Sequence, residues 1–395
     1  MSRITRYVLW ELLKTFTVTL TVMTVMMVMV FLIQEAMREN LTPETILELV
    51  PYTIPMALNF AIPGTILFAT CIVYGRMSAT NEIVALKSMG VSPTVVIWPG
   101  IILSVLLSLV TVYMNDISVH WGRKGVYRVV LHSSAKTIYS VLQAQGSFNK
   151  GNMSIVVDDV QGKNLIRPHI ERSSENPADR IRIQAEMARI EVDPVKEKLV
   201  FQLQNGRIEY GDEVVMHVAQ KDFEVDLSDT TKKRGANGTS PSNLPLRDMA
   251  SESVLQTRVI KAKRQELSTR AAYELLSGNL IGLTHPVWNE EKIKLRKEIE
   301  RKHRLATEPW RRWANGFSCL CFVLVGGAVA IRFQKFDFWS IFAVCFIPIL
   351  LAYYPLLMMG VDKAKSGELP PYCVWIGNVV LVSVGLWLIR KIRQY

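Results

Sequence analysis

One polar stretch, residues 75–90, carries the side chains best suited to bind another protein. It reads GRMSATNEIVALKSMG and lies between two apolar segments. The hydroxyl of Ser78 can cap a helix by accepting a bond from a backbone N–H, as can the side chains of Thr80 or Asn81. Glu82 then falls in the first turn, where the helix dipole favours a carboxylate. A carboxylate in this position is suited to an ion pair with a basic residue of a partner.

Apolar residues in the same stretch follow helical spacing. Ile83, Leu86 and Met89 would share one face of the helix, and Gly90 would end it. Two interpretations stay open: a helix that docks into a soluble partner, or an amphipathic connector that lies on lipid. The residues predicted to contact the partner are Ser78, Glu82, Ile83, Ala85, Leu86, Met89 and Gly90.

The sequence contains none of the common catalytic or nucleotide-binding motifs. GxxxxGK[ST], HExxH, GxSxG and CxxC are all missing. The six histidines are scattered, and the five cysteines fall in or beside apolar segments, without the spacing of a zinc site. We therefore expect no metal, no cofactor and no enzymatic activity on this chain.

Six segments are apolar and long enough to cross a bilayer, which takes about 20 residues. They are Phe16–Ile33, Tyr52–Tyr74, Val91–Met114, Trp313–Ile331, Phe338–Gly360 and Tyr372–Ile389. Their central parts hold no charged residue or histidine, whereas ion-coupled transporters keep such groups as relays. Gly326 and Gly327 suit close helix packing, and Asn59, Asn315 and Asn378 suit hydrogen bonds between helices.

Basic residues flank these segments unevenly, which predicts their orientation. The basic flanks contain Arg3, Arg6, Lys14, Arg76, Lys87, Arg332, Lys335, Arg390, Lys391 and Arg393. The loops at the opposite ends are poorer in basic residues. We therefore expect both termini and residues 75–90 in the cytoplasm, and we attribute the net charge of +11 to these flanks rather than to nucleic-acid binding.

The long polar insert after the third segment has a β pattern from Lys136 to Ser228. Apolar and polar residues alternate along it, and Asn205-Gly206 and Gly211-Asp212 are turn signals. Inward-facing positions are Leu199, Phe201, Leu203, Val214, Met216 and Val218. Short antiparallel strands at this spacing favour a sandwich or jelly roll with one apolar face. A linker at Thr230–Pro245 and helices at Val254–Leu276 and Glu290–Thr307 follow.

The predicted fold is an α-helical membrane protein with six transmembrane helices. An extracytoplasmic β jelly-roll domain is inserted between helices three and four. The parts are residues 1–135 with the first three helices, 136–228 with the jelly roll, 229–305 with the linker and outer helices, and 306–395 with the last three helices.

The stretch GRMSATNEIVALKSMGVSP resembles the signature that follows the second span in the LptF/LptG family of lipopolysaccharide-export permeases. Further similar motifs are Ile4-x-Arg6-Tyr7, Asn205-Gly206-Arg207, Leu305-Ala306-x-x-Pro309, and Leu369-Pro370-Pro371 with Trp375 and Asn378. The order of three spans, a β domain and three spans is more specific than any single motif.

This resemblance implies one half of an ABC transporter in the bacterial inner membrane. The chain would pair with a second LptF/LptG-type permease and with a dimer of an LptB-like ATPase, which would bind the ATP. The helix carrying Glu82 would insert into a groove of the ATPase, and spans one and five would form lateral gates. The periplasmic jelly roll would pass lipopolysaccharide to an LptC-like bridge protein.

The family often has several basic residues near the outer end of span one, which meet lipid A phosphates. This chain has only Arg38 there, between Glu35 and Glu39. Beyond span three, Arg123, Lys124 and Arg128 are alternative lipid-binding residues, or they anchor a helix end at the interface. The resemblance does not distinguish an LptF-like from an LptG-like chain.

Two other classes of membrane protein are alternatives to this one. Permeases of the lipoprotein-release or MacB type also have a Glu-containing cytoplasmic helix. They generally have four spans, however, with the outer domain after the first, whereas the insert here follows the third. A membrane enzyme or scaffold is the other alternative, and no catalytic constellation in the sequence favours an enzyme.

Overall fold

The computed structural model describes residues 3–39, 43–150, 153–172, 181–193, 198–210, 214–225, 240–278, 286–333 and 338–394. The chain divides into two compact units. The membrane unit comprises Met1–Met29, Ile54–His120 and Pro241–Tyr395. The inserted unit comprises Val30–Thr53 and Trp121–Ser240.

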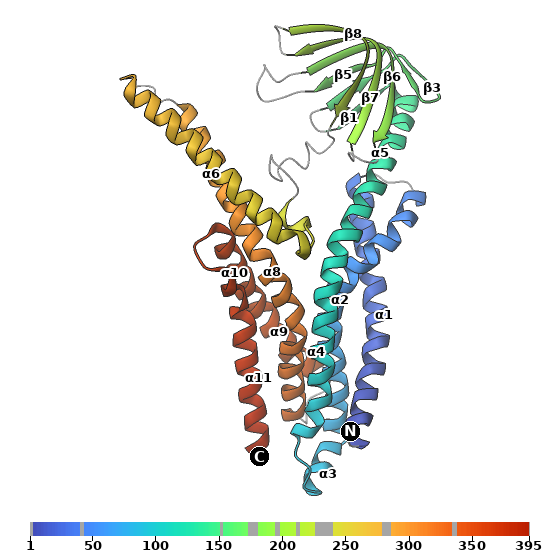
Figure 1. Cartoon of the computed structure of the whole chain (residues 1–395). Coiled ribbons are helices and arrows are strands. Elements are labelled where there is room, and N and C mark those ends of the chain that lie inside the picture. Colours follow the sequence, from blue (N-terminus) through green and yellow to red (C-terminus); the bar gives the residue numbers. More distant parts are fainter. Residues whose placement is uncertain are drawn as a thin grey trace. The chain divides into compact units, whose positions relative to one another are not determined.

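Six helices of the described chain are long and apolar enough to cross a membrane, as predicted. They involve α1 (Arg3–Glu39), α2 (Pro43–Ala79), α4 (Thr94–Ile117), α8 (Pro286–Arg332), α9 and α10 (Phe338–Pro348 and Tyr354–Ser366), and α11 (Ile376–Gln394). Figure 1 shows their order along the chain. The β insert follows the third of them, which confirms the predicted order.

The fourth span, in α8, forms the centre of the membrane unit. Of its most apolar stretch 83% is buried, against 11% for α1. A Cβ atom at Gly326 would lie 3.0 Å from Leu67, and one at Gly327 would lie 3.3 Å from Tyr74, so both glycines allow α2 to pack closely. This confirms the close packing predicted for the pair.

Two buried amides link neighbouring spans. Asn115 Nδ2 on α4 donates to Asn59 Oδ1 on α2 at 3.2 Å. Asn378 Nδ2 on α11 donates to the Ala314 carbonyl on α8 at 2.9 Å. Both Asn59 and Asn378 therefore bond between helices, as the sequence predicted.

Two spans contain a π-helical turn. The fifth span changes from α9 to α10 through η5 (Ile349–Tyr353), which follows Pro348. Proline cannot donate the usual helical hydrogen bond. The third span continues through η1 (Ser118–Arg123) into α5 (Lys124–Gln145), and the boundary between the two units along the chain falls within η1.

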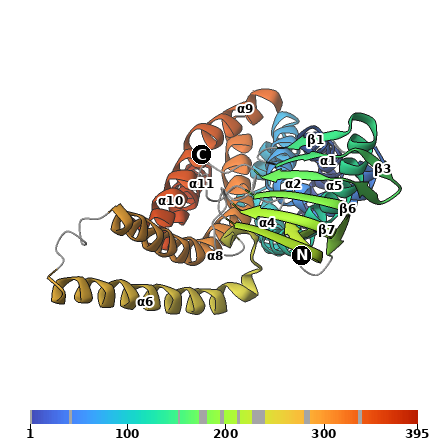
Figure 2. The same ribbon diagram turned by 90° about the horizontal axis from the view of Figure 1, so that it is seen from above.

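A helical hairpin precedes the fourth span. α6 (Leu246–Leu276) lies beside the first half of α8 (Figure 2). Arg301 Nη2 pairs with Glu252 at 2.8 Å, and Lys263 Nζ pairs with Glu291 at 3.4 Å. The helix predicted at Glu290–Thr307 therefore exists, but it is continuous with the fourth span, because α8 accommodates Pro309.

The described strands of the inserted unit form one antiparallel sheet of eight strands. They are β1 (Ser147–Lys150), β2 (Met153–Val156), β3 (Asp159–Gln161), β4 (Asn164–Ile166), β5 (His169–Arg172), β6 (Ile181–Asp193), β7 (Lys198–Tyr210) and β8 (Val214–Val225). β6 pairs with β5 along its first half and with β4 along its second half. A jelly roll requires two facing sheets, so that part of the fold stays a prediction.

The end of α5 covers the apolar face of this sheet. Ile138 and Leu142, four residues apart, belong to one buried cluster with Ile183 and Phe201. The Tyr139 hydroxyl donates to the Lys163 carbonyl at 2.6 Å and accepts from the Ile190 N–H at 2.7 Å. Burial raises the pKa of this phenol. Residues 136–145, predicted to begin the β domain, are therefore helical, because their apolar residues have helical spacing.

In β6 and β7 the pattern of buried residues shifts by one position partway along the strand. Asn205-Gly206 was predicted as a turn, but it lies within β7. Asn205 has a left-handed backbone (φ 49°), and its amide donates to Glu186 on β6 at 2.9 Å. Buried positions change there from Phe201 and Leu203 to Ile208. The two residues mark a bend in a continuous pair of strands.

Only some of the predicted inward positions lie in this core. Phe201 and Leu203 are fully buried, whereas Met216 is 42% exposed. Met216 lies opposite the buried Ile208, but on β8, which has a neighbouring strand on one side only among the described residues. The side chains of Leu199, Val214 and Val218 lie outside the described part of the structure.

Candidate functional site

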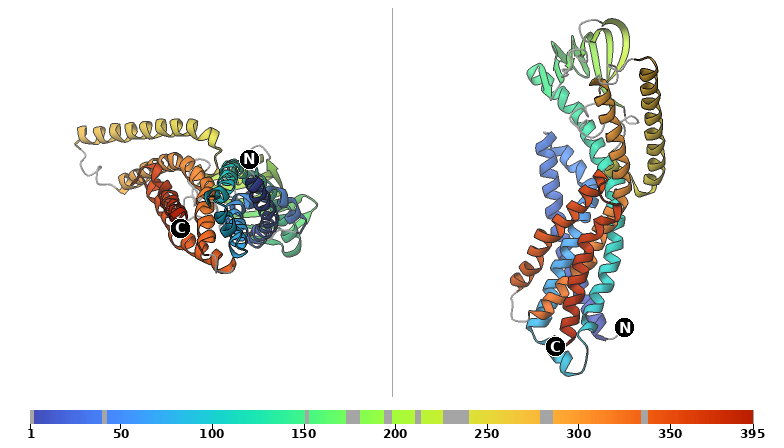
Figure 3. Two further views of the ribbon diagram at one scale, coloured as in Figure 1. Left: turned by 90° about the horizontal axis from the view of Figure 1, so that it is seen from below. Right: turned by 90° about the vertical axis from the view of Figure 1, so that its left-hand side faces the viewer.

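The polar stretch between the second and third spans forms a separate short helix, α3 (Glu82–Ser88). Figures 1 and 3 place α3 at the end of the membrane unit where α1 begins and α11 ends. Both termini and α3 therefore share one end of the helical bundle.

The chain reaches α3 differently from the prediction. Ser78 does not cap α3, because α2 continues to Ala79 and Ser78 is buried in its last turn. Asn81 occupies the N-cap position in a left-handed conformation (φ 61°), without a capping bond from its side chain. Glu82 is the first residue of α3 and therefore lies in its first turn, as predicted, and the Thr80 hydroxyl donates to Glu82 Oε1 at 3.1 Å.

The end of α3 has the geometry of a Schellman motif. Gly90 has φ 77°, and its N–H donates to the Lys87 carbonyl at 2.9 Å. The Val91 N–H donates to the Leu86 carbonyl at 3.0 Å. Glycine suits this position because it adopts a left-handed backbone at little cost. The predicted helix end at Gly90 is confirmed.

The predicted apolar stripe of α3 is divided between the core and the surface. Ile83 is fully buried and belongs to the same cluster as Leu12 and Met77, while Leu86 packs against that cluster. Met89 is 68% exposed. Ile83 therefore anchors α3 to its own bundle and does not lie on the surface that a partner would contact.

The exposed side of α3 carries a different set of residues. Val84, Ala85, Ser88 and Met89 are exposed there, and Glu82 is half-buried beside them. We call these five residues the α3 surface. It combines apolar contact area with one carboxylate, which suits a shallow apolar groove that has a basic residue at its edge.

Three of the four predicted lipid-binding residues lie close together on one helix. Arg123 ends η1, and Lys124 and Arg128 lie in the first turns of α5, all exposed. Lys124 and Arg128 are four residues apart and share a helix face. Arg38 lies in α1, but its side chain is outside the described part of the structure.

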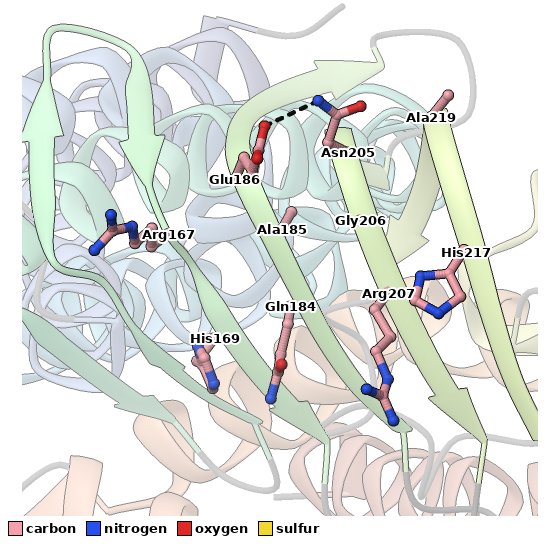
Figure 4. Close-up of a pocket in the computed structure, with 10 residues that line it drawn as sticks. All are labelled: Arg167, His169, Gln184, Ala185, Glu186, Asn205, Gly206, Arg207, His217 and Ala219. Atoms are coloured by element: carbon pink, nitrogen blue, oxygen red, sulfur yellow. Dashed lines mark hydrogen bonds between the residues drawn. The ribbon is translucent and has the colours of Figure 1, made fainter.

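The outer face of the sheet has an open, polar hollow of about 600 Å³. Its floor is a row of four residues in register on neighbouring strands, namely His169, Gln184, Arg207 and His217 (Figure 4). Arg207 pairs with Glu209 at 2.9 Å. The described residues show no cluster of three side chains able to hold a metal ion.

Sequence reasoning missed a buried charged network at the other end of α4. Arg312 on α8 is fully buried, and its Nη1 lies 3.0 Å from Asp116 Oδ1 at the end of α4. Glu308 is equally buried, with Arg311 at 2.6 Å and Lys365 of α10 at 3.5 Å. Opposite charges directly after span three and directly before span four were the signal in the sequence.

The comparisons with known proteins agree with this architecture. The family model described as "Lipopolysaccharide export system permease LptF/LptG" matches residues 6–391, essentially the whole chain. A comparison with the curated proteins finds no match. The chain therefore belongs to the LptF/LptG family of lipopolysaccharide export system permeases.

Proposed function

We propose that this chain is one permease subunit of an ABC transporter that extracts lipopolysaccharide, or a related lipid, from the outer leaflet of the inner membrane. A separate ATPase binds and hydrolyses the ATP. The family match and the six apolar helices support this proposal. The sequence also lacks a phosphate-binding loop of its own.

The attachment of α3 is the observation that carries the proposal. Ile83 holds α3 against the bundle, while the α3 surface stays accessible. Arg76 at the end of α2 also pairs with Glu11 of α1 at 2.8 Å, so α3 follows a segment tied to span one. Movement of a protein bound to the α3 surface would therefore be passed to spans one and two.

The proposal includes four partners in addition to the membrane. The α3 surface binds one subunit of an LptB-like ATPase dimer on the cytoplasmic side, where both termini also lie. A second LptF/LptG-type permease and lipid cover α1, whose apolar span is largely exposed in the single chain. The inserted unit lies in the periplasm and passes lipid to an LptC-like bridge protein.

Lipid phosphates are proposed to bind the basic residues near the outer membrane surface. Arg123, Lys124 and Arg128 offer three exposed cations on two successive turns. A hydrogen bond to a charged group contributes about 1.5–3 kcal/mol. Arg38 stays a fourth proposed contact.

Reconstitution tests the proposal directly. The chain is co-purified with its partner permease and ATPase, placed in vesicles that contain lipopolysaccharide, and supplied with a soluble acceptor protein. We expect lipopolysaccharide to reach the acceptor only when ATP is present. If ATP is hydrolysed and lipopolysaccharide stays in the vesicles, while a lipoprotein is released instead, the proposal is wrong.

A further inference from the structure

The chain passes between the membrane unit and the inserted unit four times, and two of these crossings flank the β insert. The chain leaves the membrane unit after His120 and returns at Pro241. We propose that Arg312 and Glu308 are positioning residues for lipid transfer, because they hold these two crossings together at one place on α8. This inference rests on the proposed function and adds residues that the coupling and lipid-binding sites do not include.

Arg312 contacts both crossings with one guanidinium group. Its Nη1 lies 3.0 Å from Asp116 Oδ1, one turn before the first crossing. Its Nη2 donates to the Leu244 carbonyl at 2.6 Å, just after the second crossing. The rigid fork of arginine can serve two acceptors in fixed directions, which a lysine cannot do.

Asp116 joins the same two segments directly. Its Oδ1 also accepts the N–H of Leu246, the first residue of α6, at 2.8 Å. The first N–H groups of a helix have no partner within that helix. A carboxylate from α4 therefore satisfies one of them and fixes where α6 begins.

Glu308 extends the network to the fifth span. It accepts the Ser242 hydroxyl at 3.2 Å and pairs with Arg311 on its own helix. Lys365 Nζ of α10 lies 3.5 Å from Glu308 Oε1, the same oxygen that accepts the Ser242 hydroxyl. Because α10 follows the π-helical turn η5, movement of the fifth span would reach the second crossing through Lys365 and Glu308.

The partners of these bonds distinguish a positioning role of Arg312 from general stabilisation of the fold. A buried ion pair can often be replaced by apolar side chains without loss of stability. Here the partners include a backbone carbonyl and a backbone N–H of the returning chain, which no apolar side chain can bond. Replacing Arg312 should therefore release the second crossing even where the bundle stays folded.

The first measurement is a distance that does not depend on the lipid. Nitroxide labels are placed at the exposed positions His120→Cys and Arg247→Cys of the full complex. Cys373 is changed to serine, since the other four cysteines are buried. We expect Arg312→Met to broaden the distance distribution at least twofold, with Arg312→Lys in between. An unchanged distribution in both variants overturns the inference.

The second measurement asks whether holding the crossings matters for transfer. We expect Arg312→Met to lower ATP-dependent transfer of lipopolysaccharide at least tenfold, with ATP turnover within twofold of wild type. Adding Asp116→Cys and Leu246→Cys should restore transfer under oxidising conditions and lose it again after reduction. Arg312→Met alone, under both conditions, is the control.

Two results contradict a positioning role. One is wild-type transfer in Arg312→Met despite a broadened distance distribution. The other is transfer that stays lost in the oxidised cysteine variant, with ATP turnover falling in parallel, as expected of general destabilisation. If the wild-type complex transfers no lipopolysaccharide, the proposed function fails, and the distance measurement still decides whether Arg312 holds the crossings.

Discussion

Arg76 Nη2, in the last turn of α2, lies 2.8 Å from Glu11 Oε1 on α1. This pair joins the segment that leads into α3 to the first span. The side chain of Arg76 is 48% exposed and that of Glu11 is 21% exposed, so water screens the pair. We therefore expect the pair to orient the segment that leads into α3 and to add little to the stability of the fold.

The Glu11–Arg76 pair should therefore contribute little to the free energy of unfolding. Exposed ion pairs contribute about 0.2–1 kcal/mol. We expect a double-mutant cycle with Glu11→Gln and Arg76→Gln to give a coupling energy below about 1 kcal/mol, measured by thermal unfolding in detergent. A coupling energy above about 2 kcal/mol would mean that the pair is far better shielded from water than this geometry allows.

Ile83 and Val84 are adjacent residues with opposite environments, fully buried and 42% exposed. Ile83→Ala should cost about 2–5 kcal/mol of stability, because it leaves a cavity in the core. Val84→Ala should change stability by less than about 0.5 kcal/mol. Thermal unfolding measures both, and equal losses in the two variants would contradict the assigned burial.

For binding of the ATPase, the order of the two positions should be reversed: a change at Val84 should matter more than a change at Ile83. Val84→Asp places a charge on the α3 surface and should weaken co-purification of the ATPase while the chain stays folded. Ile83→Val keeps the core nearly filled and should leave that binding unchanged. A normal yield of ATPase with Val84→Asp would exclude this side of α3 from the interface.

Gly90 offers a test of the helix end. A Cβ atom there would meet no neighbouring atom within 4 Å, so the left-handed backbone alone opposes substitution. Gly90→Ala should cost about 1–2 kcal/mol. Gly64→Ala, in an equally open position within α2, is the matched control and should be neutral or slightly stabilising. The prediction fails if the two variants unfold at the same temperature.

Asn205 allows a similar test in the sheet. Its backbone is left-handed, and its amide bonds Glu186 near the surface. Asn205→Gly should lose only the exposed hydrogen bond, about 0.5–1.5 kcal/mol, whereas Asn205→Ala should lose that bond and about 1–2 kcal/mol more from the left-handed backbone. Hydrogen exchange of the amides in β6 and β7 would report the difference. Faster exchange in the glycine variant than in the alanine variant would argue against the bend.

Local patterns predicted the elements of this fold well. The six spans follow from runs of apolar residues, and the end of α3 follows from Gly90, because both signals lie in contiguous sequence. The direction in which α3 buries Ile83 could not be predicted in the same way. A short apolar stripe has the same sequence pattern whether it packs against its own helical bundle or against a partner protein.

The sequence also did not predict which residues far apart in the chain pair with one another. Asp116 and Arg312 are 196 residues apart, and a single sequence does not show which charges meet. Asn205-Gly206 misled the strand prediction, because the same dipeptide suits a hairpin turn and a bend within a strand. In both places the packing of neighbouring elements decides the structure.

The most direct test of transport through α3 is the release of lipopolysaccharide from vesicles by the Glu82→Lys complex. Glu266→Lys, on the exposed side of α6, changes the net charge equally and serves as the control. Reversing one charge of a partly buried pair costs about 2–5 kcal/mol of binding. We predict that Glu82→Lys folds normally but no longer releases lipid on addition of ATP, while Glu266→Lys behaves as wild type. Normal ATPase binding and wild-type release with Glu82→Lys would contradict the account.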